Sequence, residues 1–221
     1  MGLNIKKNLP RLLGKHPTIL EIGANVGRDT NRFLSTFQDL DLYCFEPDPR
    51  CLDRFKTKVL PRDRVHLFEV AISDCDGHAD FYLSSGRRHS SRHFDRIPVE
   101  DSPGHINSSS LLNPTGHLKE FPWCKFEETI RVETKRLDTW ASENNIEMID
   151  FIWADVQGAE KKMIKGGFET LARARYLYTE YSNKQLYQGQ PTLKNILKLL
   201  SDFTIQQDFK KNVLLRNRLF G

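Results

Sequence analysis

The stretch Ile19-Leu20-Glu21-Ile22-Gly23-Ala24-Asn25-Val26-Gly27 decides the fold of this chain. An apolar run with one carboxylate passes directly into a turn with two glycines, as a buried strand does where it turns into a helix. A second apolar run, residues 42–45, ends at another carboxylate, Glu46, nineteen residues beyond Gly27. The carboxyl ends of neighbouring parallel strands meet at a crevice. The two runs therefore predict a nucleoside site there, with backbone N–H groups on one wall and an acceptor for ribose hydroxyls on the other.

The glycine turn indicates which nucleoside compound the crevice takes. A dinucleotide site carries G-x-G-x-x-G, whereas here Asn25 and Gly27 follow Gly23, which disfavours a pyrophosphate. Glu21 would repel a diphosphate but is suited to accept hydrogen bonds from the ammonium group of S-adenosylmethionine, with the turn serving the methionine carboxylate. The alternative is that the glycines only form a turn in a ligand-free α/β domain. We expect S-adenosylmethionine as the cofactor.

The rest of the chain alternates between strand and helix patterns. Strands are expected at residues 19–22, 42–45, 65–72, 79–83, 129–132, 148–154, 176–179, 203–209 and 212–216, and helices at 28–36, 49–59, 137–144, 159–171 and 192–202. This alternation predicts one domain, residues 1–221, in which helices cover both faces of a sheet.

Residues 84–126 interrupt the alternation. Ser, His, Arg, Pro, Gly and Asn dominate there, and no apolar period survives. A long patternless stretch inside a domain is usually functional or disordered. We expect a substrate-side insertion over the crevice, with residues 108–111 returning to the site; a surface insertion without a role is the alternative.

Two further carboxylates, Asp155 and Glu180, each close a predicted strand at the edge that carries Glu21 and Glu46. Four acids on one rim would repel one another, which favours a cationic ligand among them, such as a sulfonium with an ammonium group. Gly158 provides a tight turn that lets Glu160 turn back toward the same edge. Alternatively, Glu160 only stabilises the first turn of a helix through the macrodipole.

The spaced set of motifs resembles the FkbM-like S-adenosylmethionine-dependent methyltransferases. The motifs are E-I-G-A-N-V-G, F-E-P-D-P, S-S-S-L, L-D-T-W, W-A-D-V-Q-G-A-E and T-E-Y-S, the last followed by residues 186–190. The resemblance covers the chain from Thr18 onward. It implies a class I methyltransferase (Rossmann-like) α/β sandwich, with a mostly parallel seven-stranded sheet, helices on both faces and an antiparallel last strand. It also implies O-methylation of a hydroxyl on a sugar, glycan or secondary metabolite.

The resemblance also implies roles by position. Those for the cofactor are Glu21, Gly23, Ala24, Asn25 and Gly27 at the methionine end, Glu46 at the ribose, Ser73 and Asp74 at the adenine, and Asp155. Those on the acceptor side are the catalytic Asp155, Glu180 and Glu160, and the substrate-binding Ser109, Ser110, His105 and Tyr187. Many members of the family have a Lys before the Asp at position 155 and a Glu before the Gly at position 158. This chain has Trp153-Ala154 and Gln157 at these places.

Methyl transfer to a hydroxyl needs alignment and a general base. We expect Asp155 to be the base rather than Glu180, because it closes the central strand; His105 or His117 is an alternative base. No metal is expected, although a Mg²⁺ ion shared by Asp155, Glu160 and Glu180 is an alternative. His89 and His93 lie in a Ser- and Arg-rich stretch without zinc-site spacing, so solvated loop histidines are favoured.

The composition of the chain restricts which binding partner and which cell compartment we expect. The 221 residues carry a formal net charge of +4, which permits an anionic partner without requiring one. No C-x-x-C pair occurs among the four cysteines, Cys44, Cys51, Cys75 and Cys124. This spacing favours reduced thiols, so we expect a cytoplasmic protein. The sequence has no apolar run long enough to cross a membrane. The acceptor is expected to be a small molecule or glycan, and the oligomeric state is left open.

Two other functions compete with this reading. A nucleic-acid methyltransferase would use the basic residues of the insertion with Phe94, and later those near the carboxyl terminus; they are Arg87, Arg88, Arg92, Arg96, Lys210, Lys211, Arg216 and Arg218. No N/D-P-P-Y-type tetrapeptide follows the fourth strand, which disfavours it. A non-catalytic S-adenosylmethionine-binding protein is the second rival. All four strand-end acids are present, which argues against it, because a dead site would be free to lose their mutual repulsion.

Overall fold

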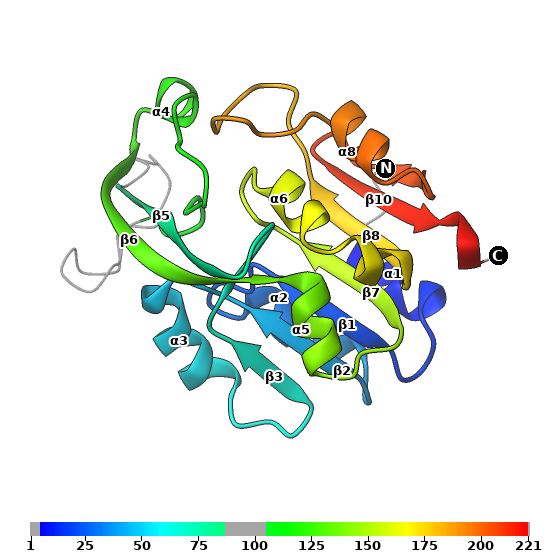
Figure 1. Cartoon of the computed structure of the whole chain (residues 1–221). Helices are drawn as coiled ribbons and strands as arrows, with labels where there is room; N and C mark the ends of the chain where they lie inside the picture. The colour runs from blue at the N-terminus through cyan, green and yellow to red at the C-terminus, as the bar shows by residue number, and fades with distance from the viewer. Residues whose placement is uncertain (1–4, 87–104, 221) are drawn as a thin grey trace.

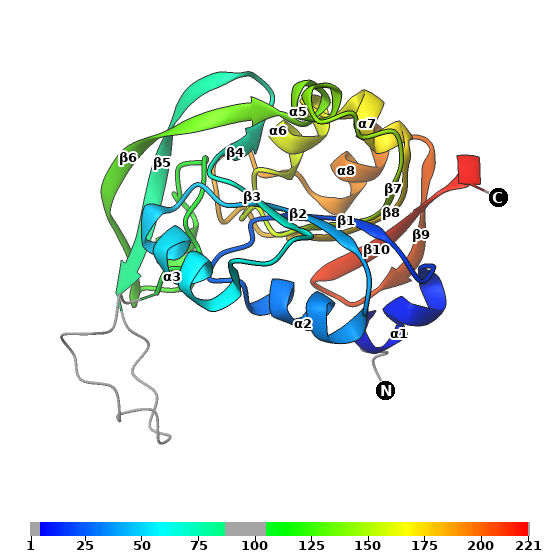
Figure 2. The same cartoon turned by 90° about the horizontal axis from the view of Figure 1, so that it is seen from below.

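A seven-stranded sheet runs through the middle of the molecule with helices on both faces (Figures 1 and 2). The computed structural model describes residues 5–86 and 105–220. The strand order is β3-β2-β1-β7-β8-β10-β9. These strands are β1 (Thr18–Ile22), β2 (Asp41–Phe45), β3 (Val65–Phe68), β7 (Ile149–Ala154), β8 (Ala174–Glu180), β9 (Phe203–Asp208) and β10 (Asn212–Asn217). This is the expected class I methyltransferase sheet.

The sheet is parallel except at β10, which pairs antiparallel with both β8 and β9. The antiparallel last strand is therefore confirmed. β1 lies between β2 and β7, with Glu21 opposite Cys44 on one side and Trp153 on the other. Because β1, β2, β7 and β8 run in the same direction, their carboxyl ends come to one edge.

One layer of helices covers each face (Figure 2). The first consists of α1 (Ile5–Leu12), α2 (Arg28–Thr36) and α3 (Pro49–Val59), the second of α5 (Leu137–Glu143), α6 (Glu160–Lys165), α7 (Phe168–Ala172) and α8 (Leu193–Leu199). The sequence sets several of these starts. Asp48, directly before Pro49, caps α3 because its side chain accepts a hydrogen bond from the backbone N–H of Arg50. Thr192 and Asn195 form a capping box at the start of α8.

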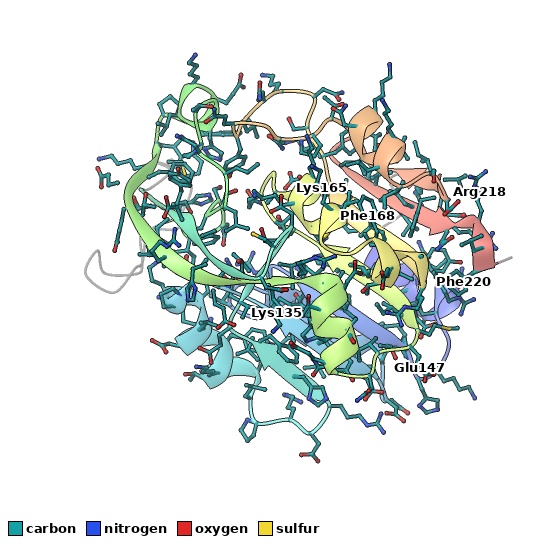
Figure 3. The ribbon with its side chains drawn as sticks, in the orientation of Figure 1. Lys135, Glu147, Lys165, Phe168, Arg218 and Phe220 are labelled. Atoms are coloured by element: carbon teal, nitrogen blue, oxygen red, sulfur yellow. The ribbon has the colours of Figure 1, made fainter. Side chains whose placement is uncertain are left out.

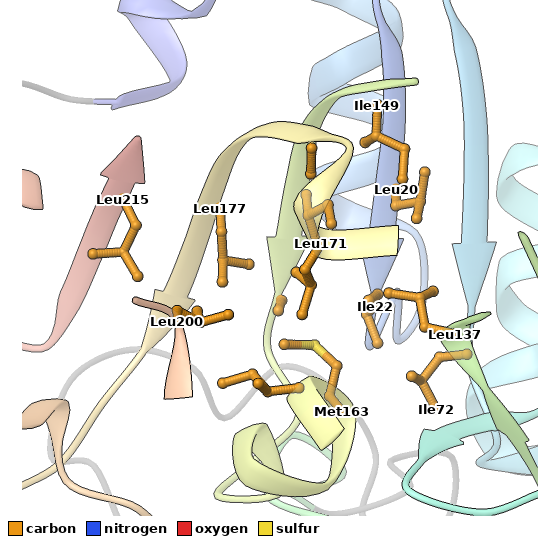
Figure 4. Close-up of a cluster of buried hydrophobic side chains, with 14 of the residues drawn as sticks. Leu20, Ile22, Ile72, Leu137, Ile149, Met163, Leu171, Leu177, Leu200 and Leu215 are labelled. Atoms are coloured by element: carbon orange, nitrogen blue, oxygen red, sulfur yellow. The ribbon is translucent and has the colours of Figure 1, made fainter. Parts of the chain in front are cut away.

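Each face of the sheet has its own apolar core. Leu20, Ile22, Ile152 and Leu177 pack against the second layer, where Met163 and Leu171 face the sheet (Figure 4). Ile19, Leu42 and Phe151 pack against the first layer, around Phe33 and Phe55. Burial of a side chain of this size contributes roughly 1.5–3 kcal/mol. The alternation of side chains along β1 therefore divides its residues between two cores.

A second, three-stranded sheet stands beside the main one, with strand order β4-β6-β5. Its strands are β4 (Ala71–Ser73), β5 (Gly77–Gly86) and β6 (Cys124–Arg136). The sequence predicted one strand over 65–72, which is wrong: the chain leaves the main sheet after Phe68 and joins the second sheet at Ala71. The strand is interrupted because the backbone of Ala71 pairs with Thr134 of β6 and no longer with β2. The apolar pattern is continuous over 65–72 and does not indicate this change of partner.

The expected patternless run over 84–126 is shorter than predicted. Residues 84–86 continue β5, β6 begins at Cys124, and a short helix α4 (His117–Glu120) lies between them. Ser110 also forms an antiparallel bridge with Tyr82. The strands β5 and β6 pair over polar residues because their hydrogen bonds are made by the backbone.

The single helix predicted over 159–171 is two helices, α6 and α7, separated by Gly166 and Gly167. A Cβ on Gly166 would lie 1.9 Å from the carbonyl oxygen of Ser73, so this close approach of α6 to β4 requires glycine. Lys165 and Phe168, on either side of the break, lie on the outside of the layer (Figure 3).

Candidate functional site

A pocket of about 290 Å³ opens at the carboxyl edge of β1, β2 and β7. Its walls come from the glycine turn after β1, the segment after β2, the turn after β7, the first residues of α2, and residues of the second sheet and of the segment 106–111. This volume is near the lower end of small-molecule sites. Of the sequence-predicted residues, Glu21, Gly23, Ala24, Asn25, Glu46, Ser109 and Asp155 line it.

The glycine turn is held by the neighbouring strands. The backbone N–H groups of Gly23 and Ala24 both donate to the carbonyl of Phe45, at 2.9 and 3.0 Å. Gly23 has φ +90°, and a Cβ there would lie 2.1 Å from the carbonyl oxygen of Asp155. The turn therefore fits tightly between β2 and β7 only because residue 23 is glycine. Gly27 lies outside the pocket lining and ends the turn with φ +77°, as the residue before α2.

Glu46 anchors the other wall. Its Oε2 accepts from the backbone N–H of Asn25 at 2.7 Å and its Oε1 from that of Asp48 at 2.8 Å. Burial raises the pKa of Glu46 to about 7, although the two N–H donors act in the opposite direction. Each oxygen has a further lone pair, so the carboxylate retains capacity to accept hydrogen bonds from a ligand.

Glu21 lies at the floor of the pocket and is buried. Its Oε2 accepts from the hydroxyl of Thr30 at 2.6 Å, and from the Cys44 thiol with an S to O distance of 3.6 Å. Thr30 comes from the first turn of α2, so the helix that follows the glycine turn orients the carboxylate that precedes it.

Asp155 and Glu180 share one hydrogen-bond donor. The side-chain nitrogen of Gln157 donates to Oδ1 of Asp155 and, at 3.4 Å, to Oε2 of Glu180. Burial and the nearby charge of Asp155 raise the pKa of Glu180 to about 7. Asp155 is exposed and lines the pocket, whereas Glu180 lies behind it and outside the lining. The pair offers a proton acceptor at the pocket wall.

Glu160 is fully buried at the start of α6, outside the pocket lining. Its Oε1 accepts from the backbone N–H of Gly158 at 3.2 Å, so the side chain does turn back toward the strand edge. Its Oε2 has no hydrogen-bond partner within the described part of the chain. Burial, and next the charges of Asp155 and Glu180, raise its pKa to about 8. Glu160 is therefore mostly protonated at neutral pH.

The serines of the predicted S-S-S-L motif differ in position. Ser109 lines the pocket, but its hydroxyl also lies 3.2 Å from both Asp48 Oδ2 and Arg50 Nη2. Ser110 lies outside the lining and donates to the carbonyl of Gln157 at 2.8 Å. The guanidinium of Arg50 also donates to the carbonyl of Ser84, which ties the segment after β2 to the second sheet.

His105 and Tyr187 lie behind the pocket wall. The Nε2 of His105 is 2.9 Å from the hydroxyl of Ser108, and its ring contacts Trp123 edge-on. Tyr187 is buried and its hydroxyl donates to the carbonyl of Ser108 at 2.8 Å and to Oε1 of Gln157 at 3.2 Å. His117 is buried among aromatic rings, and burial lowers the pKa of both histidines. Neither histidine reaches the pocket lining.

The second-sheet wall of the pocket is formed by residues before the expected pair. Val70, Ala71 and Ile72 line it, whereas Ser73 and Asp74 do not. Asp74 instead forms an ion pair with Lys162 at 2.9 Å. The apolar side chains of this wall suit an aromatic base better than the polar pair would.

Sequence reasoning missed several pocket residues, among them Arg28, Asp29, Asp48, Ile106 and Asn107. Arg28 and Asp29 directly follow Gly27 at the amino end of α2, so their place in the chain was a usable signal. Ile106 and Asn107 had none, because they lie in the stretch without periodicity.

No group of three or more His, Cys, Asp or Glu able to hold a metal ion occurs within residues 5–86 and 105–220. The basic residues proposed for nucleic acid at 87–96, together with Phe94, His89 and His93, lie outside the described residues. None of the described helices has the length and apolar character needed to cross a membrane.

Comparisons with known proteins agree with this geometry. A family model described as "Methyltransferase FkbM domain" matches residues 21–209. The 2-O-methyltransferase NoeI of Sinorhizobium fredii (strain NBRC 101917 / NGR234) is 44% identical over 98% of this chain and 86% of its own length.

Two solved structures are similar to this chain. A Clostridium thermocellum protein provisionally assigned as an rRNA methylase gives a TM-score of 0.50 at 9% identity, over 96% of this chain and 93% of its own. The N-methyltransferase NodS of Bradyrhizobium japonicum, in complex with S-adenosyl-L-homocysteine, gives 0.49 at 11% identity, over 97% and 86%.

Proposed function

Because this chain belongs to the FkbM family of S-adenosylmethionine-dependent methyltransferases, we propose that it methylates a hydroxyl of a sugar, a glycan or a secondary metabolite. The observation that carries the proposal is the exposed carboxylate of Asp155 in a pocket whose other walls suit a nucleoside. The relative's name as a 2-O-methyltransferase supports oxygen as the atom methylated. We expect a small molecule or a glycan as the acceptor, as the family resemblance implies.

The residues of the pocket fit S-adenosylmethionine. Gly23 lets the turn pack directly against the Asp155 backbone at the pocket edge, Glu21 offers a buried acceptor for an ammonium group, and Glu46 offers one for ribose hydroxyls. Val70, Ala71 and Ile72 provide an apolar wall for the base. When bound, the cofactor supplies an electrophilic methyl group on a positively charged sulfur.

The protein's own contribution is alignment and proton removal. We assign Asp155 as the general base: its carboxylate takes the proton of the acceptor hydroxyl as the oxygen forms its bond to the methyl carbon and the carbon–sulfur bond breaks. A positioned base of this kind contributes about 10²–10⁴-fold. The negative charge of Glu180 beside Asp155 favours proton uptake by the pair.

The other predicted residues have supporting roles in this proposal. Glu160 holds the turn at Gly158 rather than taking the acceptor proton, because it is buried away from the pocket. Ser109 lies nearest to the acceptor, while Ser110, His105 and Tyr187 support the wall from behind. We assign the contact with the adenine to residues 70–72, in place of Ser73 and Asp74.

We further propose that the whole chain, 1–221, is one catalytic domain in the cytoplasm, with the described segment 105–123 of the expected insertion on the acceptor side. The four thiols are free, three of them buried, which supports a reducing compartment. Ser109 and Leu111 of this segment line the pocket, which supports its place beside the acceptor.

The proposal is tested with purified protein, methyl-labelled S-adenosylmethionine and a panel of glycans, small polyols, RNA and protein. We expect label on a glycan or sugar hydroxyl as a methyl ether, identified by mass spectrometry. Binding of S-adenosylhomocysteine, measured by calorimetry, is the control for an intact cofactor site. Label found only on RNA or protein would overturn the acceptor class, and no cofactor binding would overturn the function.

A further inference from the structure

Gln157 lies where four segments of the chain meet. Its side-chain nitrogen donates to Asp155 after β7 and to Glu180 at the end of β8. Its side-chain oxygen accepts from the hydroxyl of Tyr187, and its backbone carbonyl from that of Ser110. The amide therefore uses its two N–H donors on two carboxylates and its oxygen on a phenol hydroxyl, so that each of its polar atoms has a partner.

The backbone around Gln157 is fixed independently of these contacts. Gln157 has φ 50° and Gly158 φ 92°, both in the left-handed region. A Cβ on Gly158 would lie 2.8 Å from the ring of Tyr187, and the N–H of Gly158 donates to Glu160. A left-handed non-glycine residue is strained and persists where surrounding contacts hold it. The turn is thus built to aim this side chain.

The chemical reason for an amide at this position follows from the charges around it. Two carboxylates on one donor repel each other less than two unbridged ones, because each N–H stabilises a charged oxygen. A carboxylate at position 157 would have no donor to offer and would add a third negative charge. A Gln side chain supplies donors to both carboxylates without adding charge, which a carboxylate at this position could not do.

We propose that Gln157 is a positioning residue that aims Asp155 at the acceptor hydroxyl and sets the pH at which the Asp155–Glu180 pair can take a proton. This inference rests on the proposed function, since the base acts in that reaction. Beyond that function, the inference names a residue that sets the active pH range. Through its hydrogen bond with Tyr187, this residue is also connected to the segments 105–111 and 184–190.

Several other ionisable groups face the same pair and remain constant in the comparison. Asp155 or Glu180 influences the pKa of Glu46, Glu160, Tyr178 and Tyr187, and Lys211 lowers that of Glu180. A change at position 157 replaces none of these ionisable side chains, so a shift in the pH profile that exceeds the control reports on the amide.

The test compares kcat/KM against pH for the wild type, Gln157→Glu and Gln157→Met. We expect the acidic limb to move to higher pH by about one unit or more in Gln157→Glu, because a like charge replaces a donor. Gln157→Met, which removes the donor without adding charge, is expected to move it in the same direction by less. Gln38→Glu adds the same charge at an exposed position between α2 and β2 and is the matched control, with an unmoved limb.

A second readout does not require turnover. In ¹³C-labelled protein without ligand, the carboxyl signal of Glu180 is expected to titrate at higher pH in both Gln157 variants than in the wild type. Unmoved pH limbs together with an unmoved Glu180 titration in folded variants would overturn the inference, as would an equal shift in Gln38→Glu. If the wild type methylates nothing, the proposed function fails, and the carboxyl titration alone decides whether Gln157 governs the pair.

Discussion

The backbone N–H of Asn25 donates to Oε2 of Glu46 at 2.7 Å. This bond joins the turn after β1 directly to the carboxylate after β2, so the two walls of the pocket are one hydrogen-bonded unit. Asn25 has φ 50°, a conformation that Asn tolerates better than most residues and that directs its N–H toward Glu46. A substitution in one wall is therefore expected to alter the position of the other wall and its contacts with a ligand.

Replacing Glu46 by Gln is expected to weaken S-adenosylhomocysteine binding roughly tenfold or more, since a buried hydrogen-bonding group left unpaired costs about 1–3 kcal/mol. Gln has one acceptor oxygen, so it cannot accept from both Asn25 and Asp48 and also from a ribose. Calorimetry measures the dissociation constant. Glu69→Gln, at an exposed position, is the control; equal affinities in all three proteins would contradict the ribose assignment.

Replacing Gly23 by Ala is expected to lower the melting temperature by several degrees and abolish cofactor binding. The φ of +90° is strained for any other residue, and the new Cβ would meet the Asp155 carbonyl at 2.1 Å. Differential scanning calorimetry checks the stability. Gly14→Ala has nothing within 4 Å of its Cβ and serves as the matched control. Wild-type stability and binding in Gly23→Ala would show that the turn is looser than described.

Replacing Asp155 by Asn is expected to reduce kcat by roughly 10²–10⁴-fold, the contribution of a positioned general base. The amide keeps the size of the side chain but has no basic oxygen. Affinity for S-adenosylhomocysteine is expected to stay within about threefold, since the turn that Asp155 closes is held by its backbone. Asp53→Asn, on the exposed side of α3, controls for loss of charge. Unchanged turnover would rule out Asp155 as the base.

The stability of the ligand-free protein is expected to fall as pH rises from about 5 to 8. Glu160 has its pKa raised from 4.5 to about 8 by burial, so the folded state holds a proton that the unfolded state has released. The stabilisation is complete below pH 4.5 and is lost as pH rises through 8. Glu46 and Glu180 act in the same direction up to about pH 7.

Glu160→Gln removes one of these contributions and isolates its effect. Its advantage in unfolding free energy over the wild type is expected to grow between pH 5 and pH 8, as measured by urea denaturation at both values. Glu147→Gln, at an exposed position (Figure 3), is expected to show no such growth. A difference independent of pH in Glu160→Gln would mean that Glu160 is ionised in the folded protein.

Local signals in the sequence were enough for much of the fold. The helices 28–36 and 49–59 were predicted with the bounds that the structure has, because Gly27 and the Asp48-Pro49 pair mark their starts. The strand edge that carries Glu21, Glu46, Asp155 and Glu180 followed from where apolar runs end. The break between α6 and α7 also has a local signal, the pair Gly166-Gly167.

The pairing of strands in the second sheet could not be predicted from local pattern. Residues 65–72 form one apolar run, and only the partners of Phe68 and Ala71 reveal that they belong to different sheets. The contacts of Arg50 with Ser84 and Ser109 join positions 34 and 59 residues apart. Nothing in the composition of either segment indicates such a contact.

Local signals in the sequence predicted a mostly parallel sheet and a candidate nucleoside site at its carboxyl edge. Strand direction, glycine turns and terminal carboxylates are local properties, and parallel strands bring them to one edge. Tertiary structure alone decided which carboxylate faces the pocket and which is buried: Asp155 is exposed there, while Glu160 is enclosed behind it. Burial depends on what packs against a side chain, and here that packing comes from segments distant in the chain.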